Sequence, residues 1–138
     1  MIYFLPNNPE TLALLIAGRQ LLKDPRRWCK GRMKQGQSYC INGALFEVGT
    51  PNYQIPDDYV SDDPLYYRGD LNRGQIPEPF WFLRQALKKV SDFSNVCLFN
   101  DNPETTHEQV LELLESAIEL VECEMKQNVQ DRSDDRAA

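Results

Sequence analysis

The feature that most constrains this chain is an amphipathic stretch in its last third, between residues 107 and 122. Apolar side chains recur there every three or four residues, and glutamates occupy the opposite side: Val110, Leu111, Leu114, Ala117, Ile118 and Val121 against Glu112, Glu115, Glu119 and Glu122. This period is typical of a helix with one buried and one solvated face. We therefore expect a central helix, with the Trp28 segment, the helix holding Ala44 and the helix starting near Phe80 packed against it.

The start of this helix is marked by a polar turn and by two overlapping capping patterns. The proline after Asn102 disfavours helical backbone at Asn102 itself, which indicates a turn. Thr105 and Thr106 are each followed, three residues later, by a side chain that completes a capping box, Glu108 or Gln109. Both registers remain open, so the sequence does not assign the first helical residue.

The same stretch holds the candidate functional polar residues. His107 is the only histidine and would lie in the first helical turn. An imidazole there can bind a metal or act as a base, or it can hydrogen-bond the turn before the helix. Asn100 and Asp101 are expected to build an Asx turn that holds the helix start, and ligand binding is the alternative.

Length and charge limit the class of protein. A chain of 138 residues can form one domain with a substantial core. Its formal net charge of −6 argues against direct nucleic-acid binding, which needs a basic face, and suits a basic partner. A local basic run does occur, formed by Arg26, Arg27, Lys30, Arg32 and Lys34.

Two features indicate the cellular compartment. Residues 1–5 are apolar but few, and the stretch lacks basic residues and ends at a proline, unlike a signal peptide or a membrane span. The 4 cysteines are spread along the chain without a CxxC pair, and in a chain without an export signal they are expected to be free thiols. We therefore expect a cytoplasmic protein that does not associate with membranes.

The remaining periodicity predicts a mainly α fold, a compact bundle of four or five helices with at most a minor β element. The expected elements are a helix from Asn8 that ends at Asp24, a short helix from Pro25 through Met33, a helix over 39–46, a helix from Pro79, and a buried strand or connector over 95–99. Gly43 and Ala44 are unfavourable in an isolated helix, so we expect a close helix crossing there.

Residues 50–79 interrupt this pattern with a long Pro/Tyr-rich insertion. Long irregular segments in compact domains are often functional or mobile. Tyrosines provide contact area at low entropic cost, so Tyr53, Tyr59, Tyr66 and Tyr67 are candidate binding residues; the alternative is an insertion that folds back on the core. The single domain is expected to span 1–125, with 126–138 as a polar, disordered tail.

Several of these positions form a recognisable pattern. Trp28-Cys29, then Gly43-Ala44-Leu45, then the segment from Asn100 to Ile118 resemble a family of small uncharacterised bacterial proteins, classed as a domain of unknown function, with the pattern WC, GAL and NDxxxxTHxxVLxLLxxAI. The resemblance covers about residues 8–122, and the 50–79 insertion departs from it. It implies an uncharacterised domain and marks Trp28 as a further candidate binding residue, but it implies no activity.

Cysteine and histidine chemistry is an alternative to binding. Cys29, Cys40 and His107, with Asp101 nearby, could form a zinc site or a nucleophile–base–orienter set. The two cysteines lack the close spacing of structural zinc pairs, and no nucleophile elbow precedes either. The sequence contains no phosphate loop, dinucleotide fingerprint or HExxH motif, so no cofactor is expected.

These observations favour a small acidic protein-binding or regulatory module, non-enzymatic, acting through the 50–79 insertion and its acidic surface. Its partner would be a protein of unknown identity. Two alternatives remain: a metal- or small-ligand-binding protein or hydrolase using Cys29, Cys40, Asp101 and His107, and an acidic decoy of a nucleic-acid-binding protein. The decoy would bind its partner with a steep dependence on salt, because the contact would be between charged surfaces.

Overall fold

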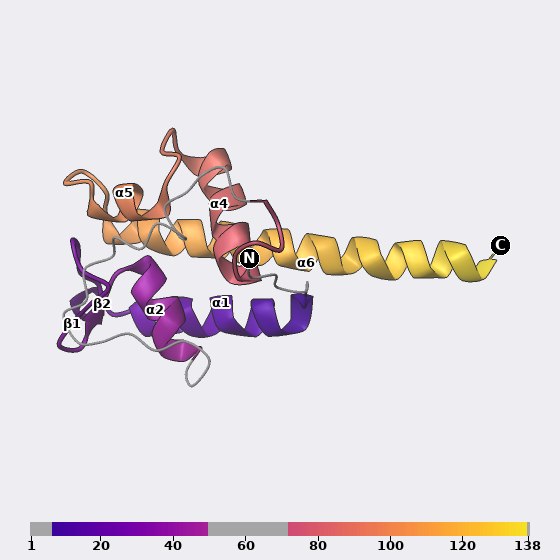
Figure 1. Ribbon diagram of the computed structural model, residues 1–138, viewed down its shortest axis with the longest axis horizontal. Helices are drawn as coiled ribbons and strands as arrows, with labels where there is room; N and C mark the ends of the chain where they lie inside the picture. The colour runs from indigo at the N-terminus through magenta and orange to yellow at the C-terminus, as the bar shows by residue number, and fades with distance from the viewer. Residues whose placement is uncertain (1–6, 50–71, 138) are drawn as a thin grey trace.

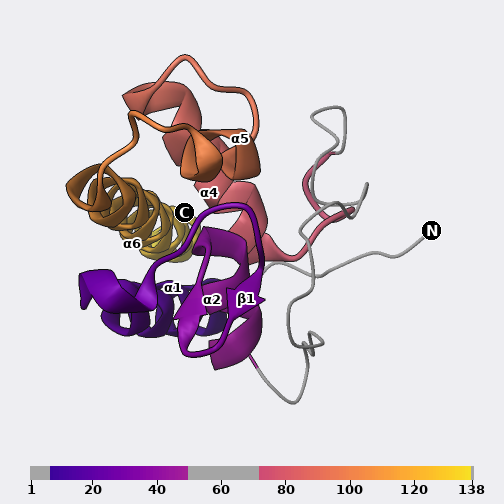
Figure 2. The ribbon, with the colours of Figure 1, turned by 90° about the vertical axis from the view of Figure 1, so that its left-hand side faces the viewer.

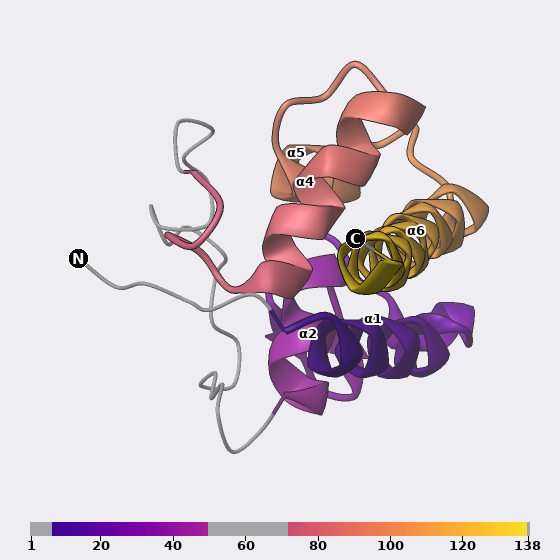
Figure 3. The same cartoon turned by 90° about the vertical axis from the view of Figure 1, so that its right-hand side faces the viewer.

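The computed structural model describes residues 7–49 and 72–137. Within them it has five α-helices, a short 3-10 helix and a two-stranded hairpin, which confirms the mainly helical fold with a minor β element. The longest helix, α6 (His107–Ala137), lies between α1 (Asn8–Leu22) and α4 (Glu78–Val90), as the view along α6 shows (Figure 3).

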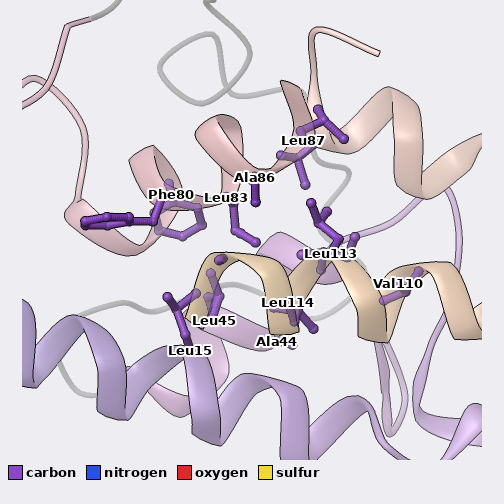
Figure 4. Close-up of a cluster of buried hydrophobic side chains, with 14 of the residues drawn as sticks. Leu15, Ala44, Leu45, Phe80, Leu83, Ala86, Leu87, Val110, Leu113 and Leu114 are labelled. Atoms are coloured by element: carbon purple, nitrogen blue, oxygen red, sulfur yellow. The ribbon is translucent and has the colours of Figure 1, made fainter. Parts of the chain in front are cut away.

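The core forms where α1 and α4 cover the apolar stripe of α6. Leu113 and Leu114 are fully buried, and Figure 4 shows Leu83 of α4 on one side of α6 and Leu15 of α1 on the other. Burying a leucine side chain contributes about 1.5–3 kcal/mol, so this stripe provides much of the stability. The helix predicted around Ala44, α2 (Ile41–Val48), packs mainly against α1 instead of α6.

The start of α6 uses one of the two capping registers that the sequence left open. The Thr106 hydroxyl accepts a hydrogen bond from the Gln109 backbone N–H at 3.2 Å. In return, Oε1 of Gln109 accepts one from the Thr106 backbone N–H at 2.9 Å. This reciprocal pair is a capping box, and it leaves the Thr105 side chain out of the cap.

The short helix predicted through Met33 is wrong beyond its first turn. A 3-10 helix, η1, covers Pro25–Arg27, and the chain then forms an antiparallel hairpin of β1 (Lys34–Gln35) and β2 (Ser38–Tyr39). The backbone is already extended at Trp28, with φ −106° and ψ 135°, and Gly31, with a φ of 83° in the left-handed region, keeps the segment from returning to a helix. The hairpin that follows lies at one end of the bundle (Figure 2).

The predicted strand or connector at 95–99 is also wrong, because these residues open a helix, α5 (Val96–Asp101). Asn95 caps it: its Oδ1 accepts a hydrogen bond from the Leu98 backbone N–H at 3.1 Å. An apolar run this short has no period to distinguish strand from helix. Asn95, a residue type favoured at helix N-caps, was the sequence signal for this helix.

The last helix is longer than its apolar stripe. It continues to Ala137, through the segment that the sequence predicts to be a disordered tail, and it projects beyond the other helices (Figure 1). After Val121 most of its described side chains are exposed. Adding residues to an existing helix avoids the cost of a new nucleus, and pairs such as Gln127 with Asp131, joined at 3.0 Å, support the polar turns.

Arg73, which lies inside the predicted 50–79 insertion, ties several helices together. The Arg73 guanidinium donates to the Glu78 carboxylate at 2.6 Å and to both Glu124 oxygens at 2.7 and 2.6 Å. It also lies 4.5 Å from the Trp81 ring centroid, a cation–π contact. Asn8 at the start of α1 donates to the same Glu124 carboxylate at 2.7 Å. The cluster thus joins α1, α4 and α6.

This cluster predicts a loss of stability in acid. The hydrogen bonds from Arg73 hold the pKa of the Glu124 carboxyl below its usual value of 4.5 in the folded chain. A group with a lowered folded pKa stabilises the fold above its unfolded pKa, and this contribution is lost as the pH falls through the folded pKa. We expect Glu124→Gln to lower the free energy of unfolding at pH 7 and to flatten its decline below about pH 4.5 in urea titrations.

A matched control is available on the same helix. Glu122 is exposed and makes no ion pair with the residues that the structure describes. Glu122→Gln should therefore change the free energy of unfolding at pH 7 by less than about 0.5 kcal/mol. An equal effect of the two substitutions at pH 7 would contradict the role assigned to Arg73.

Candidate polar site at the hairpin end

Several residues marked by the sequence come together at the end of the bundle where the hairpin, α5 and the start of α6 meet (Figure 2). Trp28, Asn100, Asp101 and His107 are linked there through hydrogen bonds and ring contacts. The four candidate tyrosines, Tyr53, Tyr59, Tyr66 and Tyr67, lie outside the described residues.

Asn100 is the centre of this cluster and is only 1% exposed. Its Oδ1 accepts hydrogen bonds from Trp28 Nε1 at 2.8 Å and from the Ile41 backbone N–H at 3.1 Å. Its Nδ2 donates to the Cys29 carbonyl at 3.0 Å and to Asp101 Oδ1 at 2.9 Å. One amide side chain therefore joins α5 to the segment before the hairpin and to the start of α2.

The Asx turn expected at Asn100 and Asp101 lies one residue later. Oδ1 of Asn102 accepts a hydrogen bond from the Glu104 backbone N–H at 2.9 Å, which is the Asx geometry. Asn100 and Asp101 instead complete α5 and face the hairpin segment. The prediction was wrong because it assumed no helix before the turn.

The other polar contacts fasten the residues before the hairpin to the turn between α5 and α6. Asp101 Oδ1 accepts from the Gly31 backbone N–H at 2.8 Å. Lys30 Nζ donates to the carbonyls of Asn102 and Thr105 at 2.6 and 3.0 Å, and it lies 5.1 Å from the Trp28 ring centroid. These charge-assisted contacts explain why this short segment is ordered without helix or long strand.

His107 joins two helix ends. Its Nε2 lies 2.6 Å from the Leu22 carbonyl oxygen, the last residue of α1. A carbonyl only accepts hydrogen bonds, so Nε2 carries a proton and donates it. The ring also lies 6.0 Å from that of Trp28. Through this hydrogen bond His107 holds the end of α1 against the start of α6. Because Nε2 donates to a carbonyl, it is not available as a metal ligand.

The two candidate cysteines are not activated thiols. Burial raises the pKa of the Cys29 thiol, and the negative charge of Asp101 adds to the effect. Burial likewise raises the pKa of Cys40, whose Sγ accepts a hydrogen bond from the Gly43 backbone N–H at 3.3 Å and so caps α2. A thiolate is the nucleophile and the metal ligand, so both environments disfavour the reactive form.

The metal hypothesis can be compared with the geometry. Within residues 7–49 and 72–137, no three histidine, cysteine or acidic side chains are grouped so that they could hold a metal ion. Cys29, Cys40 and His107 therefore do not form a ligand set. Each has instead a structural contact: the Arg32 carbonyl for Cys29, the α2 cap for Cys40 and the α1 end for His107.

Sequence reasoning missed a groove on another face, between α4 and the middle of α6. Its volume is about 610 Å³, and its apolar lining comes from Trp81, Phe82 and Leu120. Exposed Lys88 and Lys89 of α4 lie along it. The available signal was the Trp81-Phe82 pair followed by two lysines, because adjacent residues on a helix cannot both face the same core.

The fold is that of a small helical domain in which Trp28, Asn100, Asp101 and His107 contact one another and other parts of the chain. The chain belongs to a family of unknown function (DUF6197), whose model matches residues 6–120. This confirms the expectation of an uncharacterised domain family. No curated protein and no solved structure matches the chain.

Two further observations concern the extent of the family match along α6 and the character of the helices. The part of α6 from residue 121 onward lies beyond the matched residues. In the part of the chain that the structure describes, no helix combines the length and apolar character needed to cross a membrane.

Proposed function

We propose that this chain is a small cytoplasmic protein-binding module, and that the groove between α4 and α6 receives an apolar segment of a partner protein flanked by acidic side chains. The observation that carries the proposal is the open groove with an aromatic floor and two lysines beside it. Such grooves accept amphipathic helices or short apolar segments, whose side chains fill the aromatic floor.

The size and lining of the groove suit side chains of a protein. A volume of about 610 Å³ is enough for several apolar side chains. The Arg73 guanidinium lies over the Trp81 ring, 4.5 Å from its centroid, and helps to fix its position. A rigid aromatic surface of this kind loses little entropy when a partner binds, which favours tight contact by a few anchor residues.

The charges beside the groove select the chemistry of the partner. Lys88 and Lys89 are exposed and form no ion pair with another described residue. The acidic residue of the lining, Glu124, is ion-paired with Arg73 at 2.6 Å, and Arg73 also pairs with Glu78. The groove therefore presents uncompensated positive charge on a chain that is acidic as a whole, so acidic side chains beside the partner's apolar anchors are favoured.

Cysteine placement supports the compartment and provides a probe. None of the four cysteines forms a disulfide, as is usual for proteins of reducing compartments. Cys123 is exposed and lines the groove, whereas Cys40 and Cys97 are buried and Cys29 is half-buried. A maleimide therefore reacts first at Cys123 and blocks the groove without any substitution.

The test is selection from a displayed library of random 16-residue peptides on the purified full chain. We expect enriched peptides with two or three apolar anchors and neighbouring acidic residues. Binding of a synthetic enriched peptide should weaken at least tenfold after maleimide modification of Cys123, and at least tenfold in the Lys88→Glu, Lys89→Glu double variant.

A charge-matched control separates the groove from general electrostatics. Lys23 and Lys126 are exposed and lie outside the groove lining. The Lys23→Glu, Lys126→Glu variant has the same net charge as the groove variant and should keep full peptide affinity. The proposal is wrong if no peptide is enriched, or if enriched peptides bind the maleimide-blocked chain as tightly as the unmodified one.

A further inference from the structure

A second cavity lies at the other end of α4, where the connection to α5 meets the first turns of α6. Its volume is about 250 Å³. Drug-sized ligands occupy pockets of roughly 300–1,000 Å³, so this cavity fits a single small group. None of its lining residues belongs to the polar cluster of Trp28, Asn100, Asp101 and His107, or to the α4–α6 groove.

Aromatic rings and an aliphatic side chain form its apolar part. Phe93 and Phe99 contact each other edge to face, with centroids 6.0 Å apart and planes at 71°. Phe99 is 4% exposed, so its ring is held rigidly, and Val90 adds apolar surface at the end of α4. The faces of such rings are negative and attract cations within about 6 Å of the centroid.

A hydroxyl without a hydrogen-bond partner among the described residues lies in the same lining. Thr105 is only 7% exposed. Thr106 provides the cap of α6, so the Thr105 hydroxyl is not used there, and it makes no hydrogen bond with any other described residue. The Thr105 hydroxyl is therefore a group available to a ligand in this cavity.

The charge of the cavity is negative. Glu104 and Glu112 belong to its lining, are exposed, and form no ion pair with the described residues. Lys30 donates its ammonium hydrogen bonds to the carbonyls of Asn102 and Thr105 beside the cavity. Two uncompensated carboxylates would repel an anion and attract a cation.

We propose that this cavity binds an organic cation, a guanidinium or alkylammonium group carried on a short apolar stem. The cationic head lies against the Phe93 and Phe99 rings, within reach of the Glu104 and Glu112 carboxylates, and donates a hydrogen bond to the Thr105 hydroxyl. The stem leaves past Val90. The assignment does not depend on the proposed peptide groove, because the two sites share no lining residue.

The test is a titration of the full chain, labelled with ¹⁵N, followed by two-dimensional NMR. The probes are n-butylguanidinium and n-butylammonium, with n-butyrate as the anionic counterpart of equal length. We expect saturable shifts of the Phe93, Thr105 and Gln109 amides with both cations and none with butyrate. Equal shifts with butyrate, or no saturable shift with either cation, would refute the site.

Two variants and a charge-matched control locate the binding. Glu104→Gln with Glu112→Gln should weaken cation binding at least tenfold, and Thr105→Val, which keeps the shape of the side chain, at least threefold. Glu108→Gln with Glu119→Gln removes the same charge from exposed residues outside the cavity and should leave affinity unchanged. Equal weakening by both double variants would show a general charge effect and overturn the proposal.

A final comparison identifies the source of the cation. A blocked tripeptide, acetyl-Gly-Arg-Gly-amide, carries the same guanidinium as a protein side chain would. Tighter binding of the tripeptide than of butylguanidinium assigns the cavity to an arginine of a partner protein. Tighter binding of the free cation assigns it to a small amine or guanidine metabolite.

Discussion

Replacing Asn100 with alanine is expected to lower the free energy of unfolding by about 3–5 kcal/mol. The substitution removes the acceptor of Trp28 Nε1 and of the Ile41 N–H, and the donor to the Cys29 carbonyl. Each buried polar group left without a partner costs about 1–3 kcal/mol. Ile41 is fully buried, whereas Trp28 and Cys29 are partly exposed and regain some bonds to water.

The measurement is urea unfolding followed by tryptophan fluorescence and circular dichroism. Asn128→Ala is the matched control, because Asn128 is exposed and its side chain donates a hydrogen bond to Asn8 at 3.1 Å. We expect this control to cost less than about 1 kcal/mol. A loss below about 1 kcal/mol for Asn100→Ala as well would mean that the cluster around Asn100 is not what holds this end together.

Replacing Gly43 with alanine is expected to destabilise the fold by about 3 kcal/mol or more. A Cβ built on Gly43 would lie 1.8 Å from the Met33 carbonyl oxygen and 2.7 Å from its carbonyl carbon. These are backbone atoms, so no side chain can rotate away. That carbonyl also accepts a hydrogen bond from the Cys40 backbone N–H at 3.2 Å, which the displacement would break.

Gly18→Ala is the control, since it makes the same chemical change at another buried glycine. A Cβ there would meet Leu45 Cδ2 at 2.7 Å, the flexible end of a side chain. Alanine also favours a helix interior over glycine by about 1 kcal/mol, which offsets the crowding. We expect a change within about 1 kcal/mol for Gly18→Ala by the same urea titration. Equal losses for the two variants would show that crowding by backbone is not the cause at Gly43.

The sequence predicted the helices in which apolar residues repeat at helical spacing over several turns. The apolar stripe from Val110 to Val121 gave the buried face of α6, and its capping pattern gave two registers that included the right one. Helix α1 was expected from Asn8 and α4 from Pro79, and the structure begins them at Asn8 and Glu78. In these cases a local pattern and tertiary packing act in the same direction.

The elements that failed are those whose conformation depends on distant partners. The segment after Arg27 becomes a hairpin because Asp101 and Asn100, about seventy residues later, bind its backbone. Gly43 was rightly marked as a close approach, but the neighbour is the Met33 carbonyl rather than a crossing helix. The hydrophobic pattern within a short segment contains no information about contacts with residues far away in the sequence.

The sequence predicted which residues of the candidate site come together, but it did not predict the contacts that each of them makes. Trp28, Asn100, Asp101 and His107 do meet, yet each contact described joins them to the chain itself. The groove and the small cavity were not predicted, because their walls combine residues of α4 with residues of α6. Which helix faces which is a property of the packed domain, and no single stretch of sequence carries it.

The projecting end of α6 gives the domain a defined direction in space. A helix rises about 1.5 Å and turns about 100° per residue, so the stretch from Val121 to Ala137 carries the chain roughly 24 Å away from the last fully buried valine. A group joined to that end is held at a fixed distance from the bundle and at a fixed angle around the helix axis. Inserting one residue after Lys126 would swing it by about 100° around the helix axis and leave the bundle unchanged.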